Sequence, residues 1–186
     1  GKSFILKDGQ SDPSLHPQGK LQAKAIAKKF KDHPLAAIYI TPLRRTKQTA
    51  DPLADTKNII PKVVPELREI FLGDWDGGIY RRKLVNKDPL LIKMAKTHEW
   101  GEIPGAETTK NFHLRVYKGL VKIARSHPDE VIAAFVHGGV ISAILSIATN
   151  AKPLAFINAA NGSISKIVVN DDKIIVLSYN DTSHLD

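Results

Sequence analysis

The fold of this chain is decided by residues 131–140, which read Val-Ile-Ala-Ala-Phe-Val-His-Gly-Gly-Val. The apolar run is typical of a strand buried inside a sheet, and the glycines after His137 predict a turn into a helix. Such a turn brings an imidazole and free backbone N–H groups to the amino end of a helix, where anions bind well. Taken alone, the motif fits equally a strand end with a purely structural histidine.

Apolar runs and amphipathic stretches alternate along the first half of the chain, which is the pattern of strands and helices packed in α/β layers. Pro17 near the start of one amphipathic stretch and Pro34 after its end bound a helix. Thr41 is expected to cap the next helix, with Pro42 in its first turn. The expected elements are a strand at 4–6, a helix from 16 to about 33, a buried strand at 36–40 and a helix from 41 to about 53.

The second half continues this alternation and adds one insertion. Residues 80–100 are expected to be a helical insertion, at the place where a lid or specificity region would lie. Alternating stretches on both sides of Asn170-Asp171-Asp172 predict an antiparallel hairpin. The other expected elements are a strand at 62–64, a loop at 66–78, a helix at 108–126, a buried strand at 131–136, a helix at 139–147 and hairpin strands at 163–169 and 173–178. We expect a single domain over residues 1–186, since the chain contains no repeat or linker.

The composition indicates an ordinary globular protein of 186 residues, with 42% hydrophobic and 25% charged residues. There is no cysteine, which excludes disulfides, thiolate metal sites and cysteine nucleophiles. The histidine spacing matches no metal-ligand template, so we expect no metal and no other cofactor. No apolar run approaches the roughly 20 residues that span a bilayer, and the amino terminus lacks a signal-peptide core. A cytoplasmic protein without a membrane partner is expected.

The net charge of +8 favours anionic partners. Most lysines are spread along the chain, as at 24–29 and 93–96, which is typical of solvated helix faces. Tighter clusters at 44–47 and 81–83 could contact phosphates, but no nucleic-acid-reading motif accompanies them. The charge does not say which anionic partners the chain binds, and nucleic acid is a minor hypothesis.

Two other short segments lead to the same edge of the predicted sheet. Residues 41–50, Thr-Pro-Leu-Arg-Arg-Thr-Lys-Gln-Thr-Ala, point Arg45 toward the carboxyl ends of the strands. A guanidinium suits bidentate phosphate binding, although a helix arginine is usually only solvated. The apolar residues 4–6 lead into Lys7-Asp8-Gly9, a second strand end that opens onto this edge.

The order of these motifs resembles the histidine phosphatase superfamily, also called phosphoglycerate mutase-like. The resemblance covers nearly the whole chain and includes Leu-Arg-Glu-Ile-Phe-Leu-Gly-Asp-Trp-Asp-Gly at 67–77 and Pro-Gly-Ala-Glu-Thr at 104–108; the other matching segments are 5–12, 15–23, 41–50 and 136–140. It implies a three-layer α/β/α sandwich with a largely parallel central sheet. Members of this family transfer phosphate to the histidine of an Arg-His-Gly motif, and Lys7-Asp8-Gly9 stands in its place here.

The resemblance also implies roles for individual residues. Arg45 would be the second phosphate-binding arginine, and His137, with Gly138 beside it, the second histidine that contacts phosphate. Glu69 stands where the family often has its proton donor. Glu107 would brace the pocket, and fits equally well an acid that complements the dipole at a helix start.

Lys7 and Asp8 depart from the family pattern, and each departure has a physical consequence. Lysine keeps one positive charge but lacks the fork that grips two phosphate oxygens, so phosphate binding is expected to weaken. A carboxylate at position 8 repels the phosphoryl group and would form an acyl phosphate on attack. Lys7, Arg45 and a protonated His137 could partly screen this repulsion. We expect instead that Asp8 forms an ion pair with one of these cations and fills the phosphate pocket.

Three hypotheses follow from the sequence. The first is a protein that binds a phosphorylated small molecule or a phosphoprotein in a phosphate pocket and is impaired in, or incapable of, histidine-dependent phosphoryl transfer. The second is a working phosphomonoesterase, in which Asp8 is the nucleophile or activates water and Glu69 supplies the leaving-group proton. The third is an interaction module that uses the basic surface and has a closed pocket.

Overall fold

The sheet at the centre of the molecule is parallel, as expected. The computed structural model describes residues 9–100, 103–171 and 173–186, and in these ranges the strand order is β2 (Lys62–Val63), β1 (Ala37–Ile40) and β3 (Ile132–Phe135). Ile40 pairs with Val63 on one side and with Phe135 on the other. All four residues of β1 are buried, as in a strand covered on both faces.

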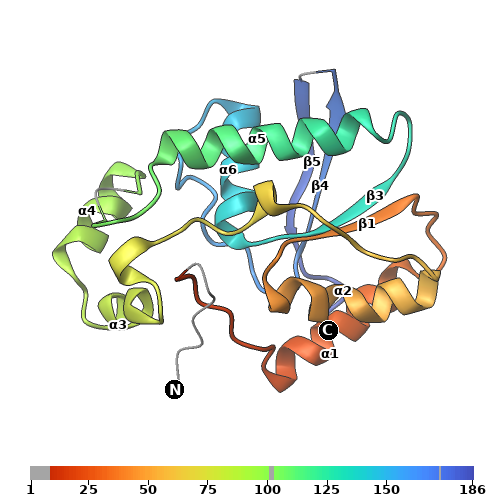
Figure 1. The fold of residues 1–186 in the computed structure, drawn as a ribbon, viewed down its shortest axis with the longest axis horizontal. Coiled ribbons are helices and arrows are strands. Elements are labelled where there is room, and N and C mark those ends of the chain that lie inside the picture. The colour runs from red at the N-terminus through yellow and green to blue at the C-terminus, as the bar shows by residue number, and fades with distance from the viewer. Residues whose placement is uncertain (1–8, 101–102, 172) are drawn as a thin grey trace.

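Helices cover both faces of this sheet, which confirms the three-layer arrangement (Figure 1). On one side, α1 (Pro17–Phe30) packs on α2 (Arg44–Lys57), and α2 lies against β1 and β3. The core on this side is the cluster Ala27, Ile38, Ile40, Ala50, Leu53 and Ala54. On the other side, α5 (Thr109–Arg125) and α6 (Gly138–Thr149) pack together. Phe112, Val116 and Val140 are fully buried in this layer.

The predicted hairpin is confirmed. Strands β4 (Ile164–Asn170) and β5 (Lys173–Asp181) pair antiparallel. The hairpin lies against α5 and α6, and its turn contains Asp171 with a positive φ of 53°. The predicted strand at 4–6 lies outside the described residues.

The predicted helical insertion consists of two helices, α3 (Ile79–Val85) and α4 (Pro89–Thr97). They are separated because Asp88 caps α4, with its side chain accepting a hydrogen bond from the Leu90 N–H at 3.0 Å. Leu91 and Met94 of α4 are buried in the same apolar cluster as Phe112 and Val116 of α5. By contrast, none of the seven residues of α3, all of them described, is buried. The insertion is thus anchored by its second helix.

Three predictions about local structure are wrong. Thr41 does not cap α2: the helix begins at Arg44 after Leu43, and the hydroxyl of Thr41 contacts His137 instead. The helix also continues through Pro52 to Lys57, where Asn58 adopts a left-handed conformation. The strand expected at 131–136 is only partly buried, with Val131 61% exposed, because β3 is paired on the β1 side alone within the described ranges.

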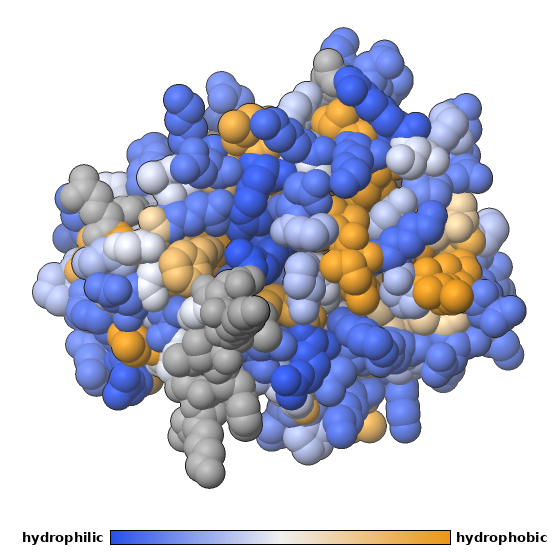
Figure 2. All heavy atoms as spheres, in the orientation of Figure 1, coloured by the Kyte–Doolittle hydropathy of each residue, from blue (hydrophilic) through white to orange (hydrophobic). Residues whose placement is uncertain are grey.

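The visible surface is mainly hydrophilic (Figure 2). Figure 2 shows hydrophilic residues over most of one face, with smaller hydrophobic areas between them. Among the helices of the described segments, none is long and apolar enough to cross a membrane.

Candidate active site

The candidate site lies at the carboxyl ends of β1 and β3. These neighbouring strands end at Ile40 and Phe135, and Thr41 and His137 follow them closely. The two side chains meet, with Thr41 Oγ1 2.9 Å from His137 Nε2. His137 is 6% exposed, and its extended backbone (φ −130°, ψ 160°) leads directly into α6. Parallel pairing therefore brings His137 to the expected edge of the sheet.

His137 is held in its neutral form. Burial lowers the pKa of the imidazole well below its usual value of 6.5, and the charges of Arg45 and Arg115 lower this pKa further. This direction of the pKa favours the neutral imidazole over the protonated form expected from the sequence. A neutral imidazole at this position can donate a hydrogen bond to an anion without being an ion-pair partner.

Arg45 lies in the first turn of α2, as the sequence predicted. Its Nη1 donates a hydrogen bond to the Ser11 carbonyl oxygen at 3.1 Å. Burial lowers the pKa of Arg45, whereas the nearby carboxylates of Glu69, Asp12 and Asp76 raise it. The guanidinium therefore lies partly buried among acids, within electrostatic reach of both Glu69 and His137.

Glu69 completes the group, with its carboxyl at the amino end of α6. Oε2 accepts a hydrogen bond from the Gly139 N–H at 3.3 Å, and Oε1 accepts one from the Ile70 N–H at 3.0 Å. Burial raises the pKa of this carboxyl, although these two N–H groups and the charges of Arg45 and Arg115 act to lower it. A carboxyl that keeps its proton at a higher pH than usual is suited to general-acid chemistry.

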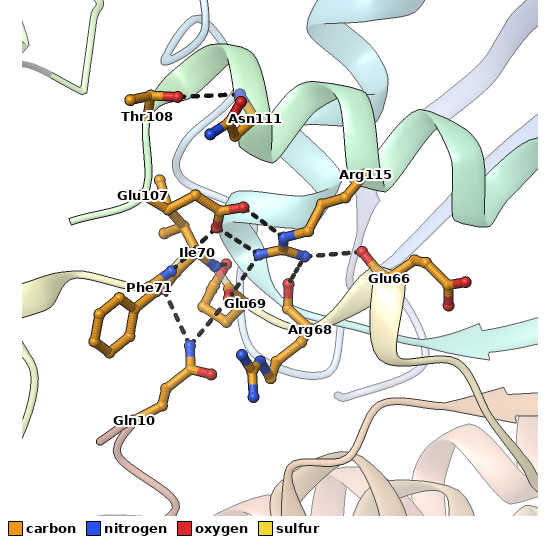
Figure 3. A network of polar contacts seen from close by, with 10 residues as sticks. All are labelled: Gln10, Glu66, Arg68, Glu69, Ile70, Phe71, Glu107, Thr108, Asn111 and Arg115. Carbon is orange, nitrogen blue, oxygen red and sulfur yellow. Dashed lines mark hydrogen bonds and ion pairs between the residues drawn. The ribbon is translucent and has the colours of Figure 1, made fainter. Parts of the chain in front are cut away.

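Glu107 braces this region, as the resemblance implied. The carboxylate forms a bidentate pair with Arg115, with Nε to Oε1 at 2.7 Å and Nη2 to Oε2 at 2.8 Å (Figure 3). The Glu107 N–H also donates to the Phe71 carbonyl oxygen at 2.9 Å. The turn at residues 104–108 is thereby fixed to the loop that carries Glu69.

Arg115 lies at the centre of this network and was not predicted from the sequence. Its Nη1 donates to the carbonyl oxygens of Glu66 at 2.8 Å and Arg68 at 2.6 Å, and its Nη2 donates to that of Glu69 at 3.0 Å. One signal was present in the sequence: Arg115 falls on the buried face of α5, between Phe112 and Val116. A charged residue on an apolar face needs partners.

Gln10 was missed as well. The side chain is 2% exposed, and its Nε2 donates to the carbonyl oxygens of Glu69 at 3.0 Å and Ile70 at 3.1 Å. The Glu69 carbonyl oxygen therefore accepts hydrogen bonds from both Gln10 and Arg115 (Figure 3). These hydrogen bonds go to backbone atoms, so they could not be predicted from complementary side chains in the sequence.

The structure thus brings together Arg45, Glu69 and His137, with Gly138 at the first position of α6. Lys7 and Asp8 lie outside the described residues, and their predicted roles stay predictions. Across the described part of the chain, no group of three or more His, Cys, Asp or Glu side chains could hold a metal ion.

Comparisons with known proteins agree on one family. The model of the histidine phosphatase superfamily (branch 1) matches residues 5–182. The metal-independent phosphoserine phosphatase of Arabidopsis thaliana is 32% identical over 182 residues, which are 95% of this chain and 75% of that protein. Phosphoserine phosphatase 1 of Hydrogenobacter thermophilus is 27% identical over 181 residues, covering 95% of this chain and 85% of the relative.

Solved structures show the same fold. Bacillus stearothermophilus YhfR superimposes with a TM-score of 0.81 at 22% identity, over 100% of this chain and 92% of that chain. The phosphoserine phosphatase of Entamoeba histolytica, in complex with 3-phosphoglyceric acid, gives a TM-score of 0.79 at 21% identity, over 100% and 91% of the two chains.

Proposed function

The chain belongs to the histidine phosphatase superfamily, and on this basis we propose that it binds the phosphoryl group of a phosphate monoester and is impaired in histidine-dependent phosphoryl transfer. The observation that carries the proposal is the meeting of Arg45, neutral His137 and the carboxyl of Glu69 at the amino end of α6. A guanidinium, an imidazole N–H and the first amides of a helix are donors that suit phosphate.

The impairment follows from the residues at the nucleophile position. Asp8 stands where the family has its phosphate-accepting histidine, and Lys7 stands where it has an arginine. A carboxylate brings negative charge toward the phosphoryl group, and Lys7 offers one point charge in place of a planar fork. Since His137 is neutral, it adds no positive charge that would offset this repulsion.

A second candidate, an active phosphomonoesterase, is favoured by Glu69. Burial raises the pKa of its carboxyl, as a proton donor to a leaving group requires. In this alternative, Asp8 attacks phosphorus or activates water, while Arg45 and His137 hold the phosphoryl oxygens. The relatives carry the names of phosphoserine phosphatases, so free phosphoserine is the first substrate to try.

One set of assays separates these possibilities. Hydrolysis of phosphoserine and of para-nitrophenyl phosphate is measured for the parent, Asp8→Ala and the double variant Lys7→Arg with Asp8→His, each with and without magnesium. Calorimetry with inorganic phosphate measures binding. We expect the parent to bind phosphate and the double variant to gain turnover. Parent turnover that disappears in Asp8→Ala would establish the second candidate. A parent that neither binds phosphate nor turns over would leave the interaction module.

A further inference from the structure

We propose that Arg115 and Glu107 are positioning residues for Glu69. Arg115 holds the backbone that carries this glutamate, and Glu107 takes up the charge of the arginine, so that the Glu69 carboxyl can keep the proton it gives to a leaving group. The inference rests on the second candidate for the proposed function, the active phosphomonoesterase, because that candidate assigns Glu69 the role of proton donor.

Arg115 uses every N–H donor of its guanidinium in a hydrogen bond. A guanidinium has five N–H donors in a fixed plane, and five hydrogen bonds leave this one. Two go to the carboxylate of Glu107, and three go to the carbonyl oxygens of Glu66, Arg68 and Glu69. The carbonyl groups belong to one short segment, so a single planar group fixes the path of residues 66–69 (Figure 3). Lysine has only three donors and could not hold the same set.

The pair of Arg115 and Glu107 is largely shielded from water. The side chains of Arg115 and Glu107 are 25% and 16% exposed, and the Arg115 guanidinium carbon lies 4.8 Å from the centre of the fully buried Phe112 ring. Charges shielded from water interact over longer distances than charges at the surface. Arg115 accordingly acts on the pKa values of both Glu69 and His137.

Two arginine charges act on the carboxyl of Glu69. Arg45 from α2 and Arg115 from α5 both favour its carboxylate form. Tyr80 from α3 lies within electrostatic reach, and the Gly139 N–H of α6, which follows neutral His137, donates to its Oε2. If both arginine charges acted fully, they would draw the proton from Glu69. The carboxylate of Glu107, paired with Arg115, partly offsets one of these two charges.

The test uses ¹³C-detected NMR titration of the glutamate carboxyls in the full chain. Glu69→Gln identifies the resonance of interest. In Glu107→Gln, which keeps the side-chain shape, the loss of the counter-charge should lower the titration midpoint of Glu69 by about one pH unit. Glu107→Asp, which keeps the charge, should retain the parent midpoint. The matched control is Lys122→Gln on the same helix, because Lys122 pairs at the surface with Glu66 at 3.3 Å.

Arg115→Lys tests the geometric half of the proposal. Lysine keeps the positive charge but lacks the planar guanidinium that holds the carbonyl groups of residues 66–69. These residues should therefore leave their buried position, and the titration midpoint of Glu69 should fall toward the usual glutamate value. An unchanged midpoint in both Glu107→Gln and Arg115→Lys would overturn the inference, and so would an equal shift in Lys122→Gln. If Arg115→Lys does not fold, the Glu107→Gln and Glu107→Asp pair decides. The failure of that candidate function is read separately, as a parent that hydrolyses neither phosphoserine nor para-nitrophenyl phosphate.

Discussion

Gly139 leaves the space that the carboxyl of Glu69 occupies. A Cβ atom at position 139 would overlap Oε1 of Glu69 and come within 3.2 Å of its Cδ, while the backbone N–H of the same glycine donates to Oε2 at 3.3 Å. The absence of a side chain on α6 therefore permits the proton-donor candidate to reach the amino end of that helix.

We expect Gly139→Ala to lower turnover while leaving the stability of the protein almost unchanged. The new methyl group displaces Glu69, and phosphatase turnover, where present, should fall about 10²-fold or more, the usual contribution of a general acid. The unfolding midpoint should change little, because alanine suits a helix better than glycine does. Gly138→Ala, which keeps the backbone N–H, is the comparison, since among the described residues its Cβ would meet only the Ile157 carbonyl oxygen, at 3.9 Å. Equal losses in the two variants would argue against a special fit at position 139.

His137 should make the free energy of unfolding depend on pH. Its folded-state pKa lies well below 6.5, whereas the unfolded imidazole titrates near 6.5. As pH falls below about 6.5, the unfolded chain binds a proton that the folded chain does not, so stability is lost down to the folded-state pKa. Above about pH 6.5 the contribution is complete. Urea unfolding from pH 7.5 to 5 should show a steeper loss for the parent than for His137→Gln; equal slopes would refute a depressed pKa.

Glu69 has the opposite linkage. Its folded-state pKa is raised above 4.5, so between that value and the folded-state pKa the folded chain holds more protons than the unfolded chain. Stability from this group therefore falls as pH rises through that interval. Glu69→Gln should be more stable than the parent at pH 7.5, and this difference should shrink on acidification to pH 4. Chemical unfolding at the two pH values measures it. A variant less stable than the parent at pH 7.5 would contradict the expectation.

Thr41→Val should destabilise the protein by about 1–3 kcal/mol, because its buried hydroxyl is the partner of His137 Nε2 at 2.9 Å, of Thr46 Oγ1 at 3.1 Å and of the Leu43 N–H at 3.3 Å. Thr56→Val is the matched control, since the Thr56 hydroxyl bonds to the Pro52 carbonyl oxygen at an exposed position. Denaturant unfolding at pH 7.5 compares the two. A loss that is no larger at Thr41 would mean that the contact with His137 adds nothing to stability.

Arg45→Lys should weaken the binding of inorganic phosphate about 10-fold, which corresponds to the loss of one charge-assisted hydrogen bond. Arg44→Lys tests whether this depends on position: Arg44 is 52% exposed at its side chain and lies 3.7 Å from Asp12, away from His137. Calorimetric titration gives both dissociation constants. Similar values for the two variants would remove Arg45 from the phosphate site.

Much of this site could be predicted because the carboxyl ends of parallel strands lie at the same edge of the sheet. His137 and the start of α2 with Arg45 follow β3 and β1 directly, so a sequence pattern suffices to bring them together. Glu69 depended on the family resemblance. Arg115 and Gln10 could not be assigned in this way, since the acceptors of Gln10 and three of the five acceptors of Arg115 are carbonyl oxygens of residues 66–70. The capping error at Thr41 has a related cause, because its hydroxyl is used in a long-range contact with His137.

The unequal burial of the two insertion helices has a consequence for how this protein can change. Leu91 and Met94 tie α4 to the main apolar cluster, so exchanging the whole insertion for that of a relative would open the core. Helix α3 has no buried residue, and its Leu84 and Val85 are 50% and 81% exposed. Leu84 and Val85 can therefore be substituted at little cost in stability, whereas Ile79 and Tyr80 at the other end of α3 pack against the main cluster and are far less free to vary.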